Sequence, residues 1–311
     1  MSTVTVAQPS SVRRNPETPP QGRTLQDLSR RLASSTILIA LVLSTLFVFP
    51  LWAFAVVVIG FVAVALYEFF TMVRHRGILV HRPLSIALGV IFTGLVAWRS
   101  FVEPGLVAAP ILDQGGTVLN WTWDIFWPAT IVLIFLRQFT RQNTFEALSG
   151  LATTLFGLAY ISGLLSYLFY LRVFKDQAGA WLILYLILVT KMGDAGAFAI
   201  GRLAGRHTLL ARVSPRKTVE GFVGAVCVSA AVGALAHPMV ERLHGSVWAG
   251  LAVGLLLGLF GQLGDLAESL IKRDCQVKDS GTLLPGLGGM LDVLDSLLFT
   301  APLFYGILIY G

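Results

Sequence analysis

Long apolar stretches dominate the chain and are separated by short polar segments. A helix needs roughly 20 apolar residues to cross a bilayer, and several stretches come close to this length. They lie near residues 32–49, 51–73, 84–102, 119–136, 148–170, 180–200, 221–240, 247–264 and 296–310. The pattern predicts about nine transmembrane helices, with the chain ends on opposite sides. The stretch near 119–136 is the least regular, because Asp124 and Pro128 interrupt it.

The composition supports this interpretation. Apolar residues make up 55% of the chain and charged residues only 13%, whereas ordinary soluble domains have about 25% charged residues. We therefore expect an all-α integral membrane protein with a polar active site on its cytoplasmic side. Cys227 and Cys275 show no metal-binding or disulfide spacing, so neither a zinc site nor a disulfide framework is indicated.

The chain divides into three parts by pattern. Residues 1–30 are rich in Ser, Thr, Pro and Arg, which predicts a disordered cytoplasmic tail. Residues 31–180 contain the N-terminal transmembrane helices, and residues 181–311 form a C-terminal transmembrane catalytic region. The first apolar stretch is longer than the core of a signal peptide and a second follows directly, so we expect it to remain as a span.

The distribution of basic residues predicts the orientation. With a cytoplasmic amino terminus, 18 of the 23 Lys and Arg residues fall in cytoplasmic segments, and the external segment 103–124 has none. Membrane proteins show this bias, which also accounts for the net charge of +6 without a nucleic-acid partner. We expect a multi-pass protein of the cell membrane whose N-terminus and active site face the cytoplasm. The polar segments 202–220 and 265–295 then lie on that side.

Acidic residues at the ends of two spans suggest a metal site. At helical spacing Asp265, Glu268 and Lys272 share one face, as do Asp292 and Asp295. Carboxylates from two helix ends suit a hard divalent cation that also keeps water and phosphate oxygens as ligands. The glycines between them would let backbone N–H groups approach phosphates. The pattern favours metal-assisted phosphoryl or nucleotidyl transfer at a membrane surface.

Two further sets of charged residues have alternative interpretations. Arg216 and Lys217 lie in a predicted first helical turn, where cations oppose the helix dipole unless an anion binds; they are otherwise simply flanking charges. Lys191 and Asp194 lie three residues apart within a span. They form either a structural ion pair or part of a site.

Three stretches carry polar residues and glycines at fixed spacings between about 190 and 300. They read Asp194-Ala195-Gly196-Ala197-Phe198 with Gly201-Arg202 and Gly205-Arg206; Ser214-Pro215-x-Lys217-Thr218-x-Glu220-Gly221; and Ser269-x-x-Lys272-Arg273-x4-Lys278-Asp279-x-Gly281-x-x-Leu284-Pro285-x-x-Gly288-Gly289-x-x-Asp292-x-x-Asp295. They resemble the motifs of the phosphatidate cytidylyltransferases, also called CDP-diacylglycerol synthases. The first spans resemble this family only in hydropathy.

The resemblance implies an activity and a set of site residues. Phosphatidate and CTP would give CDP-diacylglycerol and pyrophosphate at the membrane lipid surface, with Mg²⁺, a possible second monovalent cation such as K⁺, and a homodimer. It implies Asp265, Asp292 and Asp194 as metal ligands and Asp265, Lys272, Asp292 and Asp295 as catalytic residues. The implied substrate-binding residues are Ser214, Lys217, Thr218, Glu220, Arg273, Lys278, Asp279, Gly288 and Gly289.

Two residues depart from the family pattern. Leu287 and Val293 stand where the family has His and Arg, so either phosphate contacts are lost or the loop is repacked in an apolar cluster with Met290, Leu291 and Leu294. Two other functions also fit part of the pattern. One is a CTP-dependent polyprenol or phytol kinase, and the other is a secondary transporter with a buried coupling pair. The gathering of polar residues at one face, rather than at the midplane, disfavours the transporter.

Overall fold

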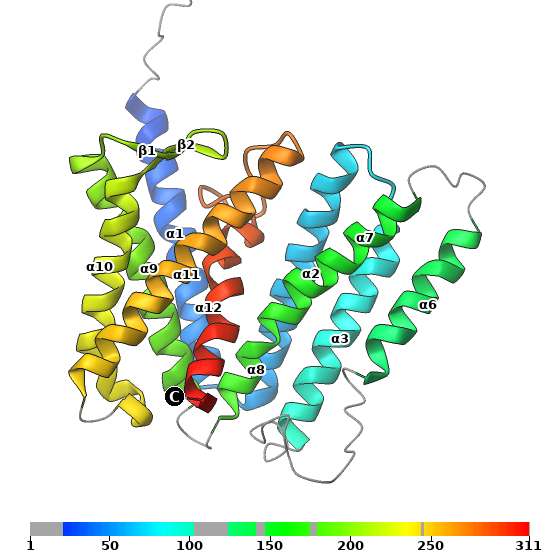
Figure 1. The fold of residues 1–311 in the computed structure, drawn as a ribbon, viewed down its shortest axis with the longest axis horizontal. Coiled ribbons are helices and arrows are strands. Elements are labelled where there is room, and N and C mark those ends of the chain that lie inside the picture. Colours follow the sequence, from blue (N-terminus) through cyan, green and yellow to red (C-terminus); the bar gives the residue numbers. More distant parts are fainter. Residues whose placement is uncertain (1–20, 103–123, 141–146, 175–178, 244–245, 311) are drawn as a thin grey trace, which may run out of the picture.

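The computed structural model describes residues 21–102, 124–140, 147–174, 179–243 and 246–310. It is a bundle of helices with one two-stranded hairpin (Figure 1). The first half contains α1 (Gln21–Phe47), α2 (Leu51–His75), α3 (Arg82–Val102), α6 (Phe126–Phe139), α7 (Ala147–Gly157), the π-helical turn η1 (Leu158–Gly163) and α8 (Tyr167–Arg172). The second half contains α9 (Gly179–Ala204), β1 (Thr208–Leu210), β2 (Ser214–Thr218), α10 (Val219–Ala236), two 3-10 turns (His237–Met239 and Glu241–Leu243), α11 (Val247–Asp274) and α12 (Met290–Tyr310).

Eight helical segments in the described residues are long and apolar enough to cross a membrane. They are Ser29–Phe47, Leu51–His75, Arg82–Val102, Ala147–Arg172, Gly179–Ala204, Val219–Met239, Val247–Asp274 and Met290–Tyr310. The all-α membrane architecture is therefore confirmed.

The expected ninth span is described only in part. The stretch near 119–136 lies partly outside the described residues, and its helix α6 has 14 residues, fewer than a full crossing requires. Pro128 lies in the first turn of α6, a position that proline tolerates. Asp124 and Pro128, the two residues that interrupt the pattern, therefore lie at the beginning of the described part of this helix. Eight of the nine expected spans are therefore found among the described residues, and the ninth, whose flanking residues lie outside them, stays a prediction.

Small residues bring α9, α10 and α11 close together. Gly250, Gly254 and Gly258 recur every four residues on α11 and face α10, where a side chain at Gly254 would meet the backbone of Ser229 and Ala230. Gly233 of α10 lies against Gly250 and Gly254 in the same way. Close backbone approach of this kind is how helices associate in a membrane, where apolar burial between helices gives little driving force.

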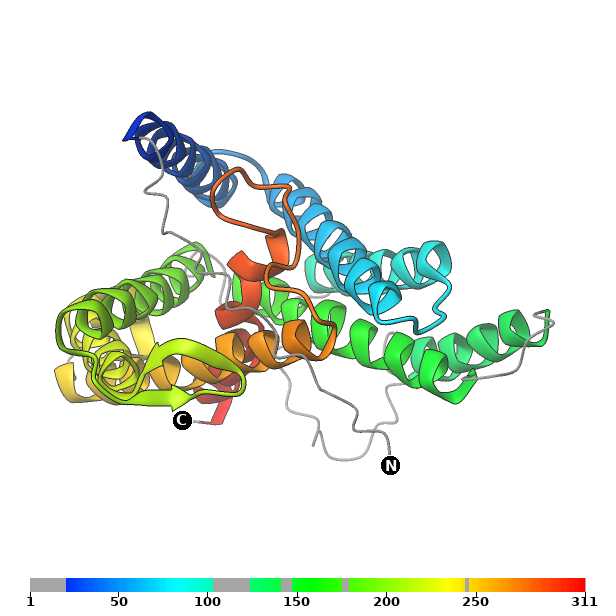
Figure 2. The same ribbon diagram turned by 90° about the horizontal axis from the view of Figure 1, so that it is seen from above.

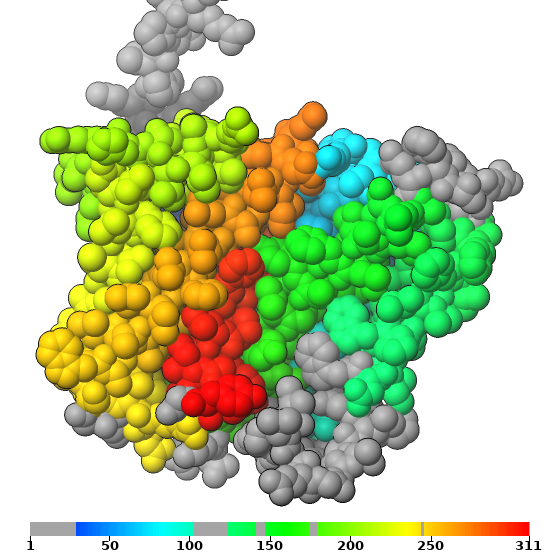
Figure 3. Space-filling model, viewed as in Figure 1, coloured from blue at the N-terminus to red at the C-terminus, as the bar shows by residue number. Residues whose placement is uncertain are grey.

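Helix α12 lies in the middle of the bundle. Viewed from above, it is surrounded by α2, α9 and α11 (Figure 2), and on the face shown in Figure 3 it lies between α11 and the α7–α8 segment. Leu298, Ala301 and Phe304 of α12 are fully buried in the apolar core. The first turn of α12 is therefore held at a junction of several elements.

The polar segments gather at one end of the bundle. The hairpin β1–β2, the segment 275–289 between α11 and α12, and the turn after α2 lie at the same end, and the C-terminus lies at the other (Figure 1). The strands pair antiparallel, with Thr208 opposite Thr218. Helix α1 begins at the polar end, where the Ser34 hydroxyl donates a hydrogen bond of 3.0 Å to the Pro285 carbonyl.

Candidate functional site

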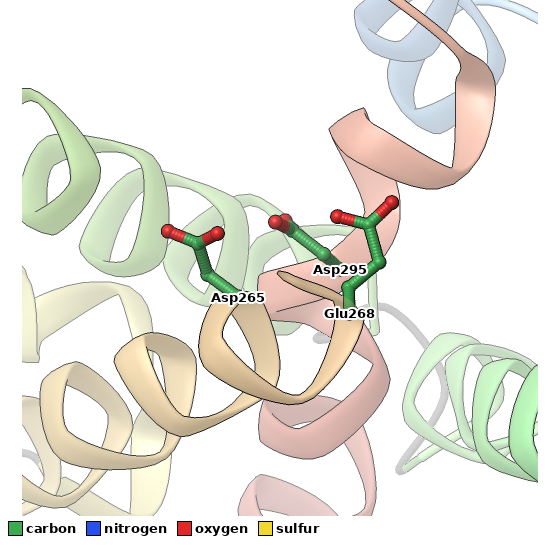
Figure 4. A group of neighbouring side chains, drawn as sticks. All are labelled: Asp265, Glu268 and Asp295. Atoms are coloured by element: carbon green, nitrogen blue, oxygen red, sulfur yellow. The ribbon is translucent and has the colours of Figure 1, made fainter. Parts of the chain in front are cut away.

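Three carboxylates from α11 and α12 lie together near the polar end. Asp265 and Glu268 come from α11 and Asp295 comes from α12 (Figure 4). One oxygen of each lies within 4.8 Å of the others. Glu268 is fully buried, Asp295 is 6% exposed, and Glu268 Oε1 has no hydrogen-bond partner among the described residues. Buried, unpaired carboxylate oxygens are unfavourable, and a hard cation with oxygen ligands would satisfy them.

Lys272 connects this carboxylate cluster to Asp292. Its Nζ donates to Glu268 Oε2 at 2.8 Å and to Asp292 Oδ1 at 2.5 Å. The other oxygen of Asp292 accepts hydrogen bonds from Ser280 N at 3.0 Å, Ser280 Oγ at 2.9 Å and Gly289 N at 2.8 Å. Both oxygens of Asp292 therefore bind protein donors. The structure brings Asp265 and Asp295 together, with Glu268 as the third member, and places Asp292 beyond Lys272.

A second set of polar residues lies between α9, α11 and α12. Lys191 Nζ donates to Asp194 Oδ2 at 3.1 Å and to Ser296 Oγ at 2.8 Å. Gln262 Nε2 donates to Asp194 Oδ1 at 3.2 Å. Lys191 and Asp194 thus form the ion pair that their spacing suggested, and this pair is joined to α12 next to Asp295.

The charges of the two sets do not balance. Five carboxylates, those of Asp194, Asp265, Glu268, Asp292 and Asp295, face three ammonium groups, those of Lys191, Lys217 and Lys272. If all are ionised, these eight side chains carry two excess negative charges, and the burial of Glu268 and Asp295 makes such an excess unfavourable. A divalent cation would neutralise it, so the residues present fit a magnesium site.

A cavity of about 620 Å³ opens beside these carboxylates. Its walls come from α9, the hairpin, α10 and α11, and they include Asp194, Ser214, Arg216, Lys217, Thr218 and Asp265. Lys217 Nζ lies 2.7 Å from Asp265 Oδ1. The cavity is therefore lined both by cationic and hydroxyl groups and by Asp265 of the carboxylate cluster. It also contains apolar side chains, among them Phe198 and Phe222.

The hairpin is fixed to the start of α10 by two side chains. Thr218 is the N-cap of α10, and its Oγ1 accepts a hydrogen bond from Gly221 N at 3.1 Å, as N-cap threonines do. The Glu220 carboxylate accepts hydrogen bonds from Arg206 N at 3.0 Å and His207 N at 3.2 Å, and its other oxygen lies 2.6 Å from His207 Nδ1. Glu220 thus holds the hairpin in position. Because Lys217 is part of strand β2, its place in the cavity wall depends on this arrangement.

The remaining expected site residues lie on the 275–289 segment and at the end of α11. Arg273 Nε donates to the Val213 carbonyl at 3.1 Å, which joins α11 to the hairpin turn. Lys278 and Asp279 are exposed. Gly288 has a φ of +98°, a backbone conformation that favours glycine, and it pairs with Leu284 in a turn.

Leu287 and Val293, which depart from the family pattern, were predicted to form an apolar cluster with three neighbouring residues, and this prediction is wrong in part. Met290, Leu291 and Leu294 are buried in the core. Leu287 and Val293 are only half-buried and lie outside this core cluster. The reason is helical geometry: Val293 is on a different face of α12 from Leu291 and Leu294, and Leu287 lies in the turn before the helix.

Sequence reasoning missed three residues of this region. Glu268 was placed on the correct helix face but not among the ligands. Glu68, in the last third of α2, is 4% exposed and contacts the start of α12. An isolated carboxylate within an apolar span is itself a signal of function, so Glu68 could have been found. Tyr160, whose buried hydroxyl has no partner among the described residues, lies in the π-helical turn η1, and no sequence pattern predicts such a turn.

Comparison with known proteins shows the family of the chain. A sequence model of the cytidylyltransferase family matches residues 29–310. The chain belongs to this family. It is a multi-pass membrane enzyme that transfers a nucleotidyl group, as a cytidylyltransferase does.

Several bacterial proteins are similar to this chain over long stretches. A phosphatidate cytidylyltransferase of Staphylococcus epidermidis is 42% identical over 216 residues, which cover 66% of this chain and 79% of the relative. One of Staphylococcus saprophyticus is 39% identical over 193 residues, covering 61% and 72%. An uncharacterized protein of Escherichia coli K12 is 40% identical over 156 residues, or 50% of each chain.

Proposed function

We propose that this protein is a phosphatidate cytidylyltransferase, which converts CTP and phosphatidate to CDP-diacylglycerol and pyrophosphate. One observation carries the proposal: Asp265 belongs both to the carboxylate cluster and to the wall of the 620 Å³ cavity. A nucleotide triphosphate in the cavity would therefore meet cationic groups and the metal site together. The names of the staphylococcal relatives support phosphatidate as the acceptor.

The reaction needs positioning more than covalent chemistry. A phosphate oxygen of phosphatidate attacks the α-phosphorus of CTP, a new P–O bond forms, and the bond to the β-phosphate oxygen breaks as pyrophosphate leaves. Phosphate is already a competent nucleophile, so the protein has to align two polyanions and neutralise their charge.

The cavity residues have matching roles. Lys217 and Arg216 hold triphosphate oxygens, and Ser214 adds a hydroxyl donor. The N-terminus of α10, capped by Thr218, directs further positive potential at the same place. Phe198 and Phe222 offer apolar surface to the base.

We propose Mg²⁺ at the cluster of Asp265, Glu268 and Asp295, with Asp194 adjacent. A bound Mg²⁺ would supply charge neutralisation at the triphosphate. Asp292 would keep Lys272 in place next to the cluster. The polar end would face the cytoplasm, where CTP is available, as the distribution of basic residues predicts. A second monovalent cation and a homodimer remain predictions of the family resemblance.

The decisive experiment follows the label of CTP. Purified protein in lipid nanodiscs is given phosphatidate, Mg²⁺ and CTP labelled at either the α- or the γ-phosphate. We expect the α-label in the lipid and the γ-label in pyrophosphate. Transfer of the γ-label to lipid, with release of CDP, would identify a CTP-dependent kinase instead.

A matched pair of variants ties the activity to the site. Asp265→Asn should abolish label transfer, because it removes one charge from the proposed metal cluster. Asp274→Asn is the control on the same helix: Asp274 is exposed and pairs with Arg76, an arrangement worth little energy. Equal activity of both variants would refute the assignment of Asp265.

A further inference from the structure

Glu68 is a buried carboxylate that lies far in sequence from the candidate site. It is surrounded by apolar residues of α2 and is 4% exposed. A charge at this depth is unfavourable unless it is paired. Its partners come from the other half of the chain: Oε1 accepts a hydrogen bond from Met290 N at 2.9 Å, and Oε2 accepts one from Leu291 N at 2.9 Å.

These contacts fix the beginning of α12. The first N–H groups of a helix have no partners within the helix, and the positive end of the helix dipole favours a negative charge there. Glu68 satisfies two of these groups with its two carboxylate oxygens. Because Asp292 and Asp295 lie in the first two turns of α12, the position of Glu68 determines where both carboxylates lie.

A chain of polar contacts, in which the Ser280 hydroxyl shares its single proton between two carboxylates, joins Glu68 to the carboxylate cluster. Ser280 Oγ lies 3.2 Å from Glu68 Oε2 and 2.9 Å from Asp292 Oδ2. Asp292 then holds Lys272, and Lys272 holds Glu268. Each step is a direct contact between polar atoms, so a displacement of Glu68 would be transmitted to Lys272.

Two glycines of the sequence signature make room for this carboxylate. A Cβ at Gly289 would lie 2.5 Å from Glu68 Oε2, and a Cβ at Gly281 would lie 2.8 Å from Glu68 Cδ. Either contact would force Glu68 away from α12. The lack of a side chain at these two glycines therefore allows Glu68 to reach α12. The sequence pattern had instead suggested that the glycines let backbone N–H groups approach phosphates.

We propose that Glu68 is a positioning residue for nucleotidyl transfer: it anchors the start of α12 and the 280–289 segment, and through Ser280 and Asp292 it holds Lys272 beside the carboxylate cluster. The inference rests on the proposed function. Glu68 does not line the CTP cavity, so it affects the catalytic step and not the binding of CTP.

The kinetic test compares Glu68→Gln with Glu68→Asp and with a packing control. Gln keeps the volume but replaces one acceptor oxygen by a donor that faces an N–H group. We expect kcat to fall about 10–100-fold, as for other residues that orient a site through hydrogen bonds, while KM for CTP stays within about twofold. Asp keeps the charge and should recover part of kcat. Val62→Ala, at a fully buried position of the same helix, controls for loss of stability.

Hydrogen–deuterium exchange provides a readout that does not depend on activity. The amides of residues 280–292 should exchange at least about tenfold faster in Glu68→Gln than in the parent, and at the parental rate in Val62→Ala. If Glu68→Gln does not accumulate, Glu68→Asp is compared with Val62→Ala by the same two measurements.

Three results would overturn the proposal: parental kcat in Glu68→Gln, the same loss of kcat in Val62→Ala, or unchanged exchange at 280–292. A parent without activity on phosphatidate would instead refute the proposed function, and the exchange comparison would still decide whether Glu68 anchors α12.

Discussion

Replacing Glu268 by Gln tests whether Glu268 is a metal ligand or only the partner of Lys272 in a structural ion pair. Glu268 is fully buried and lies 2.8 Å from Lys272 Nζ. With an effective dielectric constant of about 20, this attraction is about 6 kcal/mol. Asp265 and Asp295 each lie within 4.8 Å, so each repels Glu268 by at least about 3.5 kcal/mol on the same scale. Without a cation, the two repulsions match or exceed the attraction.

Whether Glu268→Gln raises or lowers the stability of the protein therefore depends on whether Mg²⁺ is bound. In EDTA, Glu268→Gln should leave the unfolding midpoint unchanged or raise it, because Lys272 keeps Asp292 as a partner and the repulsion disappears. In saturating Mg²⁺ the parent gains stability from the bound ion. Each tenfold loss of Mg²⁺ affinity in the variant removes about 1.4 kcal/mol of that gain.

The assay is thermal unfolding of the purified protein in detergent, with EDTA and across a Mg²⁺ titration. We expect the midpoint of the parent to rise by several degrees with Mg²⁺ and that of Glu268→Gln to rise much less. Asp274→Asn, which removes an exposed carboxylate from the same helix, should behave as the parent. A variant that gains as much as the parent from Mg²⁺ would show that Glu268 is not a ligand.

Three further changes test other parts of the site. Lys217→Gln should raise KM for CTP about tenfold or more, because a hydrogen bond to a charged group is worth about 1.5–3 kcal/mol; steady-state kinetics check this, and Arg212→Gln in the exposed hairpin turn is the control. Tyr160→Phe removes a buried hydroxyl without a described partner, so its unfolding midpoint should equal or exceed that of the parent; a lower midpoint would show that the hydroxyl has a stabilising partner. Leu287→His with Val293→Arg should keep parental stability, since both positions are half-buried and outside the core; a large drop in midpoint would restore the repacking interpretation.

The apolar pattern predicted most of the fold because the bilayer imposes a minimum length on every crossing helix. It misplaced the ends of the helices that carry the site. The apolar runs end near 264 and begin near 296, whereas α11 continues to Asp274 and α12 begins at Met290. The additional turns carry Glu268, Lys272 and Asp292. Their polar side chains interrupt the pattern because they face one another and not lipid.

The candidate site was predictable where its residues share a helix. The spacing of Glu268 and Lys272 predicts the ion pair that the structure shows, and the spacing of Lys191 and Asp194 predicts theirs. Contacts between helices were not predictable from spacing. The sequence does not indicate that Asp295, and not Asp292, lies beside Asp265, because this depends on how α12 is rotated against α11.

That rotation is the property that Glu68 controls. Apolar burial between helices gives little driving force in a membrane, so interhelical hydrogen bonds contribute to how one helix is oriented against another. Hydrogen bonds from two successive amides, those of Met290 and Leu291, to one carboxylate permit a single orientation of the first turn of α12. Asp295 then points toward α11 and Asp292 toward the 280–289 segment. A carboxylate on the second helix of the chain thus determines which of the two acidic residues on the last helix joins the proposed metal site.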